Sequence, residues 1–169
     1  MILSYDDIKK YNKKQKKNTF FISFTITAIL SLTIIYIVLM PHKVQGSSMD
    51  PTLRDKDIVF SISPRLKQYQ RGDIVLINSV LIGKNIVKRI IAVGEDTVVI
   101  RGNKVYVNGN ELNEDYLKTT QYSTPDISVK VPRGYIFVLG DNRDISNDSR
   151  YFGCISEAEI NGIYLFHIN

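Results

Sequence analysis

Ser48 lies in the short segment Gly46–Leu53, with a glycine shortly before it and Pro51 shortly after it. A serine hydroxyl becomes a strong nucleophile when a neighbouring base removes its proton. The glycine permits a close backbone approach, and the proline stiffens the chain beyond the serine. The backbone N–H of Ser48 is then a natural donor to the oxyanion that forms when its own hydroxyl attacks a carbonyl. We therefore treat Ser48 as a candidate nucleophile.

Two kinds of base could activate this serine. The chain has two histidines, His42 and His167, and a Ser-His-Asp arrangement would require one of them to fold back onto Ser48 with a carboxylate behind it. Nothing in the sequence indicates such a fold, and we expect both histidines to be surface or interface residues. A lysine is the alternative, but with an ordinary pKa near 10.4 only about one solvated lysine in 2,500 is neutral at pH 7. A catalytic lysine must therefore be buried, because a low-dielectric environment disfavours the ammonium form.

Lys88 has the environment that a basic amine requires. It lies in the apolar run Asn85–Val93, with isoleucine and valine on both sides. Because side chains alternate across a strand, we expect Lys88 to face the site and Arg89 to face water. The plain alternative is an edge-strand lysine with an exposed amine. The presence of the Ser48 segment makes the catalytic interpretation the better one.

A third polar segment, Gly140–Arg150, follows an apolar strand that ends at Leu139. Such a loop could hold a catalytic pair in register without reacting itself, although a solvated loop would have the same composition. The expected contacts are an ion pair between Asp148 and Arg150, a bond from Asp141 to the backbone or to Arg143, and a Ser146 hydroxyl that orients the Lys88 amine.

A long apolar run, Thr19–Met40, contains no charged residue and ends at Pro41. About 20 helical residues span a bilayer core, so we expect residues 19–41 to form one transmembrane helix. A cleaved secretory signal would need a shorter apolar core and a small-residue cleavage site, which the residues after Met40 do not provide. Residues 1–18 carry six lysines and two aspartates. The positive-inside rule then predicts a cytoplasmic basic tail and an extracytoplasmic domain over residues 42–169.

The remaining charge argues against a nucleic-acid-binding protein. The whole chain has a formal net charge of +5, but beyond residue 18 there are 16 basic and 15 acidic residues. A DNA-binding domain would need its basic residues clustered on the folded face, whereas a basic tail beside an apolar segment attracts anionic lipid. We expect the lipid bilayer, not nucleic acid, to be a partner. Cys154 is the single cysteine, so no disulfide can form within the chain, and we expect it to be buried and unreactive.

The pattern after residue 50 is that of short strands separated by turns, which predicts a mainly β domain. We expect Arg101–Asn103 to be a tight hairpin, Asn108–Gly109 a further turn, and residues 94–131 a small hairpin excursion from the core sheet. A single helical turn is expected at Ser156–Ile160. The expected strands are Asp57–Ile62, Asp73–Asn78, Asn85–Val93, Thr97–Ile100, Lys104–Val107, Gly134–Leu139 and Ile163–His167.

Three of these segments, in their order and spacing, resemble the signature segments of bacterial type I signal peptidases. They are Ser48-Met49-x-Pro51-Thr52-Leu53, Val87-Lys88-Arg89 with Ile90-Ile91, and Gly140-Asp141-Asn142-Arg143-x-x-Ser146-x-Asp148-Ser149-Arg150, and the strand Arg71–Val75 is similar to a fourth. The resemblance implies an antiparallel β domain of the signal-peptidase and LexA-like type, preceded by one N-terminal transmembrane helix. It also implies that Ser48 is the nucleophile, Lys88 the general base, and Ser146 and Asp148 the support of that base.

The chain departs from the family pattern at two places. After the lysine strand it reads Ala92-Val93-Gly94-Glu95-Asp96, without the proline that the family commonly has there. Gly46 stands where some members carry a hydroxyl that helps to bind the oxyanion. That assistance would have to come from the Gly46 or Ser47 backbone N–H groups or from the Ser47 hydroxyl.

The resemblance implies a membrane-anchored serine endopeptidase that removes signal peptides from exported preproteins through an acyl-enzyme, with no metal or other cofactor. Two alternatives remain open. One is a specialised or non-catalytic signal-peptidase-like factor for pilin or surface-protein assembly, and the other is a self-cleaving regulator, against which the apolar run argues. Export machinery and pilin substrates are further expected partners.

Overall fold

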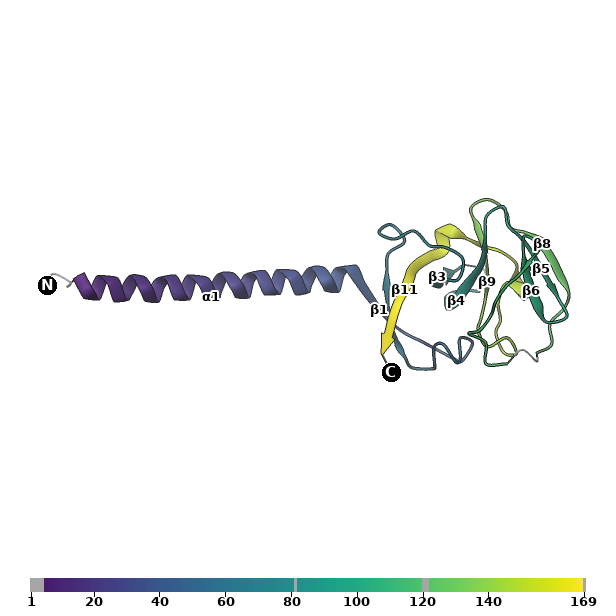
Figure 1. The fold of residues 1–169 in the computed structure, drawn as a ribbon, viewed down its shortest axis with the longest axis horizontal. Helices are drawn as coiled ribbons and strands as arrows, with labels where there is room; N and C mark the ends of the chain where they lie inside the picture. Colours follow the sequence, from purple (N-terminus) through teal and green to yellow (C-terminus); the bar gives the residue numbers. More distant parts are fainter. Residues whose placement is uncertain (1–4, 81, 120–121, 169) are drawn as a thin grey trace. The chain divides into compact units, whose positions relative to one another are not determined.

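The computed structural model of the protein describes residues 5–80, 82–119 and 122–168, and it divides the chain into two compact units, Met1–Leu39 and Met40–Asn169. The first unit consists mainly of helix α1, Tyr5–Val38. The second contains strands β2 to β11 and two short helical turns (Figure 1). The fold is the expected one, mainly antiparallel β with one N-terminal apolar helix.

Helix α1 carries a long apolar stretch whose described side chains are mostly exposed. The stretch Lys13–Ile35 has a mean hydropathy of 1.8 and is long enough to cross a membrane, and none of its most apolar window is buried. Four threonine hydroxyls in the helix donate to the carbonyl oxygen four residues earlier, at 2.8–3.0 Å. These bonds satisfy the hydroxyl groups within the helix, as a lipid environment requires.

The bounds of this helix differ from the expected ones at both ends. It begins at Tyr5, so most of the lysine-rich tail is helical. It ends at Val38, and Leu39–Lys43 forms strand β1, although we expected the helix to continue to residue 41. The reason is that Pro41 cannot continue a helix, while an apolar run alone does not indicate where strand pairing takes over.

The larger of two sheets has the strand order β1-β2-β11-β3-β4-β9-β10. Every pair with a described register is antiparallel, and β4 lies between β3 and β9. The bounds are β2 Ile58–Ile62, β3 Ile74–Ser79, β4 Lys84–Val93, β9 Tyr135–Leu139, β10 Ile155–Ser156 and β11 Ile160–Ile168. Since β4 is a central strand, both neighbours fix the position of any side chain that it carries.

The second sheet, in the order β7-β6-β5-β8, is formed within residues 94–131. Its strands are β5 Thr97–Arg101, β6 Lys104–Val107, β7 Asn110–Glu111 and β8 Ile127–Lys130. It packs against the β4 and β9 region through one core cluster that includes Ile91, Val98 and Phe137. The hairpin between β5 and β6 turns at Gly102 and Asn103, as expected. Figure 1 shows β5, β6 and β8 side by side beyond β9.

Each of the seven expected strands corresponds to a strand of the structure, but four short strands were missed. These are β1, β7, β8 and β10, none longer than five residues. Such strands exist through pairing with distant segments, which local periodicity does not reveal. The one-turn helix α2, Ser149–Phe152, was also missed, whereas the 3-10 turn Glu157–Glu159 lies within the expected turn.

The turn that carries Ser48 is anchored to the sheet by its apolar neighbours. Met49 and Leu53 are 1% and 0% exposed and pack with Val44, Val59 and other side chains of one core cluster. Burying two such side chains contributes about 1.5–3 kcal/mol each. The segment around Ser48 is therefore a packed part of the domain and not a free loop.

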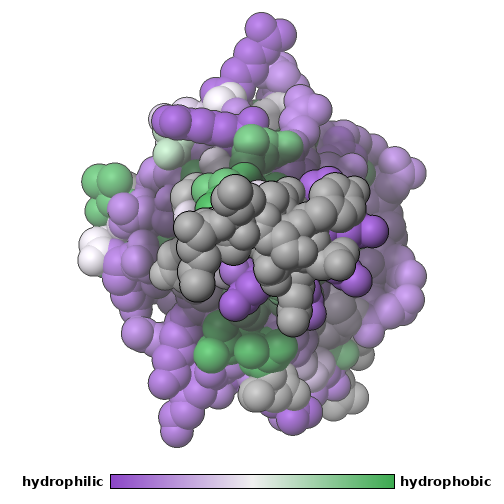
Figure 2. All heavy atoms as spheres, turned by 90° about the vertical axis from the view of Figure 1, so that its left-hand side faces the viewer, coloured by the Kyte–Doolittle hydropathy of each residue, from purple (hydrophilic) through white to green (hydrophobic). Residues whose placement is uncertain are grey.

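The face of the molecule seen in Figure 2 is mainly hydrophilic, with separate apolar patches.

Candidate active site

The amine of Lys88 and the hydroxyl of Ser48 meet across the fold. Lys88 Nζ donates to Ser48 Oγ at 2.6 Å, although the two residues are 40 positions apart in the chain. Lys88 lies in β4, opposite Val75 of β3, and is only 3% exposed. Burial lowers its pKa to about 8, against the opposing effect of the Asp148 carboxylate. At pH 7 roughly one molecule in ten then carries a neutral amine, compared with about one in 2,500 for a solvated lysine.

Neither histidine forms a hydrogen bond with Ser48 in the described part of the chain. His42 lies in β1, and burial lowers its pKa. His167 lies in β11, and its Nδ1 is 2.9 Å from the Tyr164 hydroxyl. Cys154 is partly buried, and burial raises the pKa of its thiol. The basic side chain that is hydrogen-bonded to Ser48 is thus that of Lys88.

Asp148 and Arg150 form the expected ion pair inside the polar loop. Arg150 Nε and Nη2 donate to the two oxygens of Asp148 at 2.8 and 3.0 Å, and both side chains are almost fully buried. Asp148 Oδ2 also accepts from the Gly140 N–H at 3.0 Å. A carboxylate so bonded fixes the loop backbone beside the Lys88 amine.

Ser146 is close to the pair, but the expected bond to the Lys88 amine is not present. Its Oγ is buried and has no hydrogen-bond partner in the described part of the chain. The space around it is tight, because a methyl group on Gly140 would overlap both the Ser146 hydroxyl and the Ser48 carbonyl oxygen. The Lys88 amine donates to Ser48 Oγ instead. Ser146 Oγ therefore stays without a hydrogen-bond partner among the described residues.

The carboxylate of Asp141 bonds neither to the backbone nor to Arg143 among the described residues, which differs from the expected contacts. Its carboxylate receives Arg89 Nε at 2.9 Å and Arg89 Nη2 at 2.6 Å, and the Thr52 hydroxyl at 2.5 Å. The expectation that Arg89 faces water is also wrong. Its side chain is only 12% exposed, because its guanidinium forms a bidentate ion pair with the Asp141 carboxylate. Asp141 thereby ties the strand that carries Lys88 to the turn that carries Ser48.

Gly46 and Ser47 precede the nucleophile at the surface. Gly46 has φ +83°, which favours glycine, and its N–H donates to Asp55 Oδ1 at 2.8 Å. A side chain at this position would meet no atom within 4 Å, so the turn conformation and not close packing accounts for the glycine. The Ser47 carbonyl accepts from Asn142 Nδ2 at 3.1 Å, and the Ser48 carbonyl from the Asn142 N–H at 3.0 Å.

A cleft of 680 Å³ opens directly onto the pair. Its polar lining includes Ser47, Ser48 and Lys84, and apart from Pro41 its apolar residues come from three segments. These are Leu76 and Ile77, then Ile82, Ile86 and Val87, then Ile145. The cleft is lined by both Ser48 and Lys88, and its volume is enough for several residues of an extended peptide.

Sequence reasoning missed the residues that join these segments. Thr52 and Arg89 stand inside segments already singled out, so their neighbours in sequence could have indicated a role. Asn142 likewise belongs to the polar loop. Glu114 and Tyr116, which contact Arg143 and Arg89, lie in an unremarkable stretch and gave no local signal. Their contacts exist only through the fold.

Comparison with known proteins places this geometry in a family. The family model "Signal peptidase, peptidase S26" matches residues 17–168. The chain belongs to the signal peptidase family. Signal peptidase I V of Bacillus subtilis is 34% identical over 163 residues, covering 88% of this chain and 96% of that protein. A signal peptidase I of Bacillus amyloliquefaciens is 36% identical over 169 residues, covering 90% of this chain and 87% of that one.

A solved structure supports the same assignment. The crystal structure of a signal peptidase I from Enterococcus faecalis has a TM-score of 0.53 and 38% sequence identity, and the match covers 57% of this chain and 97% of that chain. The family and the apolar helix together indicate a membrane-anchored peptidase. The antiparallel fold and the family resemblance expected from the sequence are confirmed.

Proposed function

We propose that this protein is a membrane-anchored serine endopeptidase that removes N-terminal signal peptides from exported preproteins, with Ser48 as nucleophile and Lys88 as general base. The observation that carries the proposal is the 2.6 Å bond between Ser48 Oγ and a buried lysine amine whose pKa is about 8. The names of the relatives, all signal peptidases I, supply the substrate class. The family membership supplies the reaction, hydrolysis of a peptide bond.

In the proposed mechanism, neutral Lys88 takes the proton of the Ser48 hydroxyl as its oxygen attacks the scissile carbonyl. The tetrahedral intermediate collapses, the C–N bond breaks, and the Lys88 ammonium returns the proton to the leaving amine of the mature protein. The signal peptide remains as an ester on Ser48. Lys88 then takes a proton from a water molecule that attacks this ester. The ester C–O bond breaks, the signal peptide leaves as a carboxylic acid, and the Lys88 ammonium returns the proton to Ser48 Oγ.

The oxyanion would be stabilised first by the Ser48 backbone N–H. This N–H has no hydrogen-bond acceptor among the described residues, so it is free to donate. The Gly46 N–H is already bonded to Asp55. Ser47, through its backbone N–H or its hydroxyl, is therefore the better second donor to the oxyanion. Removal of one such donor typically lowers kcat by a factor of roughly 10² to 10³.

Four buried polar residues are proposed to support the pair without reacting. Asp148 and Arg150 hold the loop backbone, and Asp141 joins the lysine strand to the serine turn. Ser146, whose hydroxyl is unpaired and close to Gly140 and the Ser48 carbonyl, would orient the Lys88 ammonium after proton transfer. Such groups act by fixing geometry.

The cleft suggests which side chains are accepted. Its apolar wall of isoleucine, leucine and valine leads directly to Ser48, so we propose that small apolar side chains of the signal peptide bind there before the cut. We also propose that residues 1–18 lie in the cytoplasm and that the β domain lies outside, because lysines flank the apolar helix on its amino side. Placing the cleft outside puts it where exported preproteins emerge.

The direct test uses the full chain in detergent or vesicles with a purified preprotein. Ser48→Ala and Lys88→Ala should each abolish cleavage. Ser128→Ala and Lys130→Ala, which change exposed residues of β8, should cleave like the parent. If either variant of the pair cleaves at the parent rate, the proposed mechanism is wrong.

A specialised factor for pilins or other surface proteins is the second candidate. A non-catalytic version would need neither Ser48 nor Lys88, and the two are bonded to each other here, so it is disfavoured. Depletion of the protein followed by mass spectrometry of surface proteins distinguishes a general peptidase from a specialised one. Many uncleaved preproteins indicate the general peptidase, and a single unprocessed pilin indicates the specialist.

A further inference from the structure

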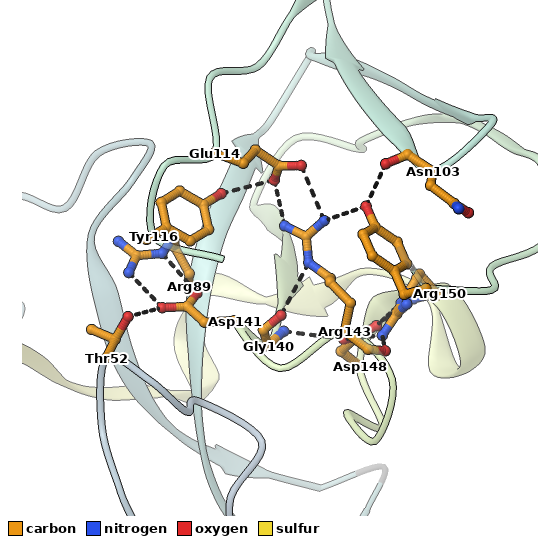
Figure 3. A network of polar contacts seen from close by, with 11 residues as sticks. Thr52, Arg89, Asn103, Glu114, Tyr116, Gly140, Asp141, Arg143, Asp148 and Arg150 are labelled. Carbon is orange, nitrogen blue, oxygen red and sulfur yellow. Dashed lines mark hydrogen bonds and ion pairs between the residues drawn. The ribbon is translucent and has the colours of Figure 1, made fainter. Parts of the chain in front are cut away.

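The segment after strand β7 contacts residues of the polar loop, of the strand that carries Lys88 and of the turn that carries Ser48. Within residues 113–118, Glu114 contacts Arg143 and Tyr116 contacts Arg89 (Figure 3), and Lys118 contacts Asp50. Lys118 Nζ is 3.1 Å from Asp50 Oδ2, two residues after the nucleophile. The other two contacts reach residues that act on the polar loop and on the lysine strand. We call residues 113–118 the strap.

Glu114 holds the polar loop through Arg143. Arg143 Nη1 donates to Glu114 Oε2 at 3.1 Å, Arg143 Nη2 donates to Glu114 Oε1, and the two side chains are only 1% and 9% exposed. Arg143 Nη1 also donates to the Tyr122 hydroxyl at 3.0 Å. Arg143 Nε donates to the Gly140 carbonyl at 3.1 Å, so a carboxylate of the strap fixes the arginine that in turn fixes the loop backbone.

Tyr116 holds the lysine strand through Arg89. The Arg89 guanidinium lies over the Tyr116 ring at 4.0 Å from its centre, and the Tyr116 hydroxyl donates to Glu114 Oε1 at 2.8 Å. Arg89 in turn donates to the Asp141 carboxylate, which also accepts a hydrogen bond from the Thr52 hydroxyl in the turn that carries Ser48. Figure 3 shows this second chain of contacts, from Glu114 through Tyr116 and Arg89 to Thr52.

Both chains of contacts converge on adjacent loop residues. The first chain reaches Gly140 and the second passes through Asp141. The next residue, Asn142, donates its N–H to the Ser48 carbonyl at 3.0 Å. Glu114 is the shared starting point. A displacement of the strap would therefore move the loop that buttresses Ser48 and the strand that carries Lys88.

The geometry points to Glu114 and Tyr116 as positioning residues of the strap that align Ser48 with Lys88 without touching substrate. This inference rests on the proposed function. Glu114 and Tyr116 do not line the proposed substrate cleft, and their partners Arg143 and Arg89 do not line it either. Substitution of Glu114 or Tyr116 should therefore change the rate of the chemical step without changing substrate binding.

Tyr116→Leu and Glu114→Gln test the inference in the full chain, with kcat and KM measured on a signal-peptide substrate. We expect Tyr116→Leu to lower kcat roughly 10- to 100-fold, the usual effect of displacing reacting groups by about 1 Å, with KM unchanged. Tyr116→Phe should recover most of kcat, because the ring over Arg89 remains. Glu114→Gln keeps the size of the side chain but removes its charge, and we expect a smaller loss confined to kcat.

Matched controls come from strands β6 and β7 of the second sheet. Glu111→Gln removes a carboxylate whose partner Lys104 is exposed, and Tyr106→Leu removes a tyrosine of β6, so both should keep the parent kcat. Thermal unfolding of every variant ensures that kcat is compared well below each transition. If Tyr116→Leu does not fold, the Glu114→Gln and Tyr116→Phe pair carries the test.

Parent-like kcat in Tyr116→Leu and Glu114→Gln, or a loss that lies entirely in KM, would overturn the positioning role. An equal loss in Tyr116→Phe and Tyr116→Leu would contradict the part assigned to the ring. These outcomes differ from failure of the proposed function, in which the parent does not cleave or Ser48→Ala still does.

Discussion

The pH dependence of cleavage tests the central physical claim, because only the neutral amine of Lys88 can accept the serine proton. Since burial lowers its pKa to about 8, kcat/KM should rise with pH, reach half its plateau at about pH 8, and level off above. Lys84 offers a way to move this midpoint. Its positive charge contributes to lowering the pKa of Lys88, so its removal should raise that pKa.

The size of the shift follows from strand geometry. Lys84 and Lys88 are four residues apart on one strand, on the same face, which separates their backbones by about 13 Å. Two charges at that distance interact by about 0.3 kcal/mol in water and about 1.3 kcal/mol at an effective dielectric constant of 20. Lys84→Gln should therefore raise the midpoint by about 0.2–0.9 and lower kcat/KM at pH 7 about two- to eightfold.

The assay is kcat/KM against pH at low ionic strength for the parent, Lys84→Gln and Lys84→Glu. Reversing the charge should about double the shift, and about 0.5 M salt should remove most of it, because the screening length falls below the separation. Lys43→Gln is the matched control. Lys43 also lines the cleft but is not among the main charges acting on Lys88, so its midpoint should stay at about 8. A midpoint that stays fixed in both Lys84 variants, or moves to lower pH, would refute the reasoning.

Three further predictions concern the scaffold around the pair. Gly140→Ala should abolish cleavage, because the added methyl overlaps the Ser146 hydroxyl and the Ser48 carbonyl, and a cleavage assay on folded protein would show it. Asp148→Asn should lower the free energy of unfolding by about 3–5 kcal/mol, since it leaves the buried Arg150 charge without its partner; urea unfolding measures this, and a change below about 1 kcal/mol would contradict it. Leu53→Ala should lower it by about 2–5 kcal/mol, because Leu53 is fully buried beneath the nucleophile turn; the same titration checks it, and unchanged stability would mean that the turn is not anchored there.

The strands that the sequence predicted are those whose pattern is local. Ile74–Ser79 and Lys84–Val93 carry long apolar runs bounded by turn residues, and both are central strands of the large sheet. Strand β1 could not be predicted, because Leu39 and Met40 continue the apolar run of the helix without a break. Its strand character comes from its place at the edge of the sheet beside β2, a pairing between distant residues.

The contacts of charged side chains were harder to predict than the residues themselves. The Asp148–Arg150 pair was expected correctly, because the two residues are neighbours in sequence and in one turn of helix. The partner of Asp141 was not, because Arg89 stands 52 positions earlier and reaches it only when β4 and β9 pair. Alternation along β4 correctly separated Lys88 from Arg89, but it could not show that the second face is also covered.

By itself the sequence determined the candidate site residues, their order and the presence of an apolar helix, since residue type and local periodicity are properties of the chain. Only the tertiary structure decided that the Lys88 amine lies 2.6 Å from the Ser48 hydroxyl, and that Glu114 and Tyr116 contact Arg143 and Arg89. The physical reason is that the burial which lowers the lysine pKa is produced by side chains from many distant segments. A lysine in an apolar strand becomes a base only after those segments have packed around it.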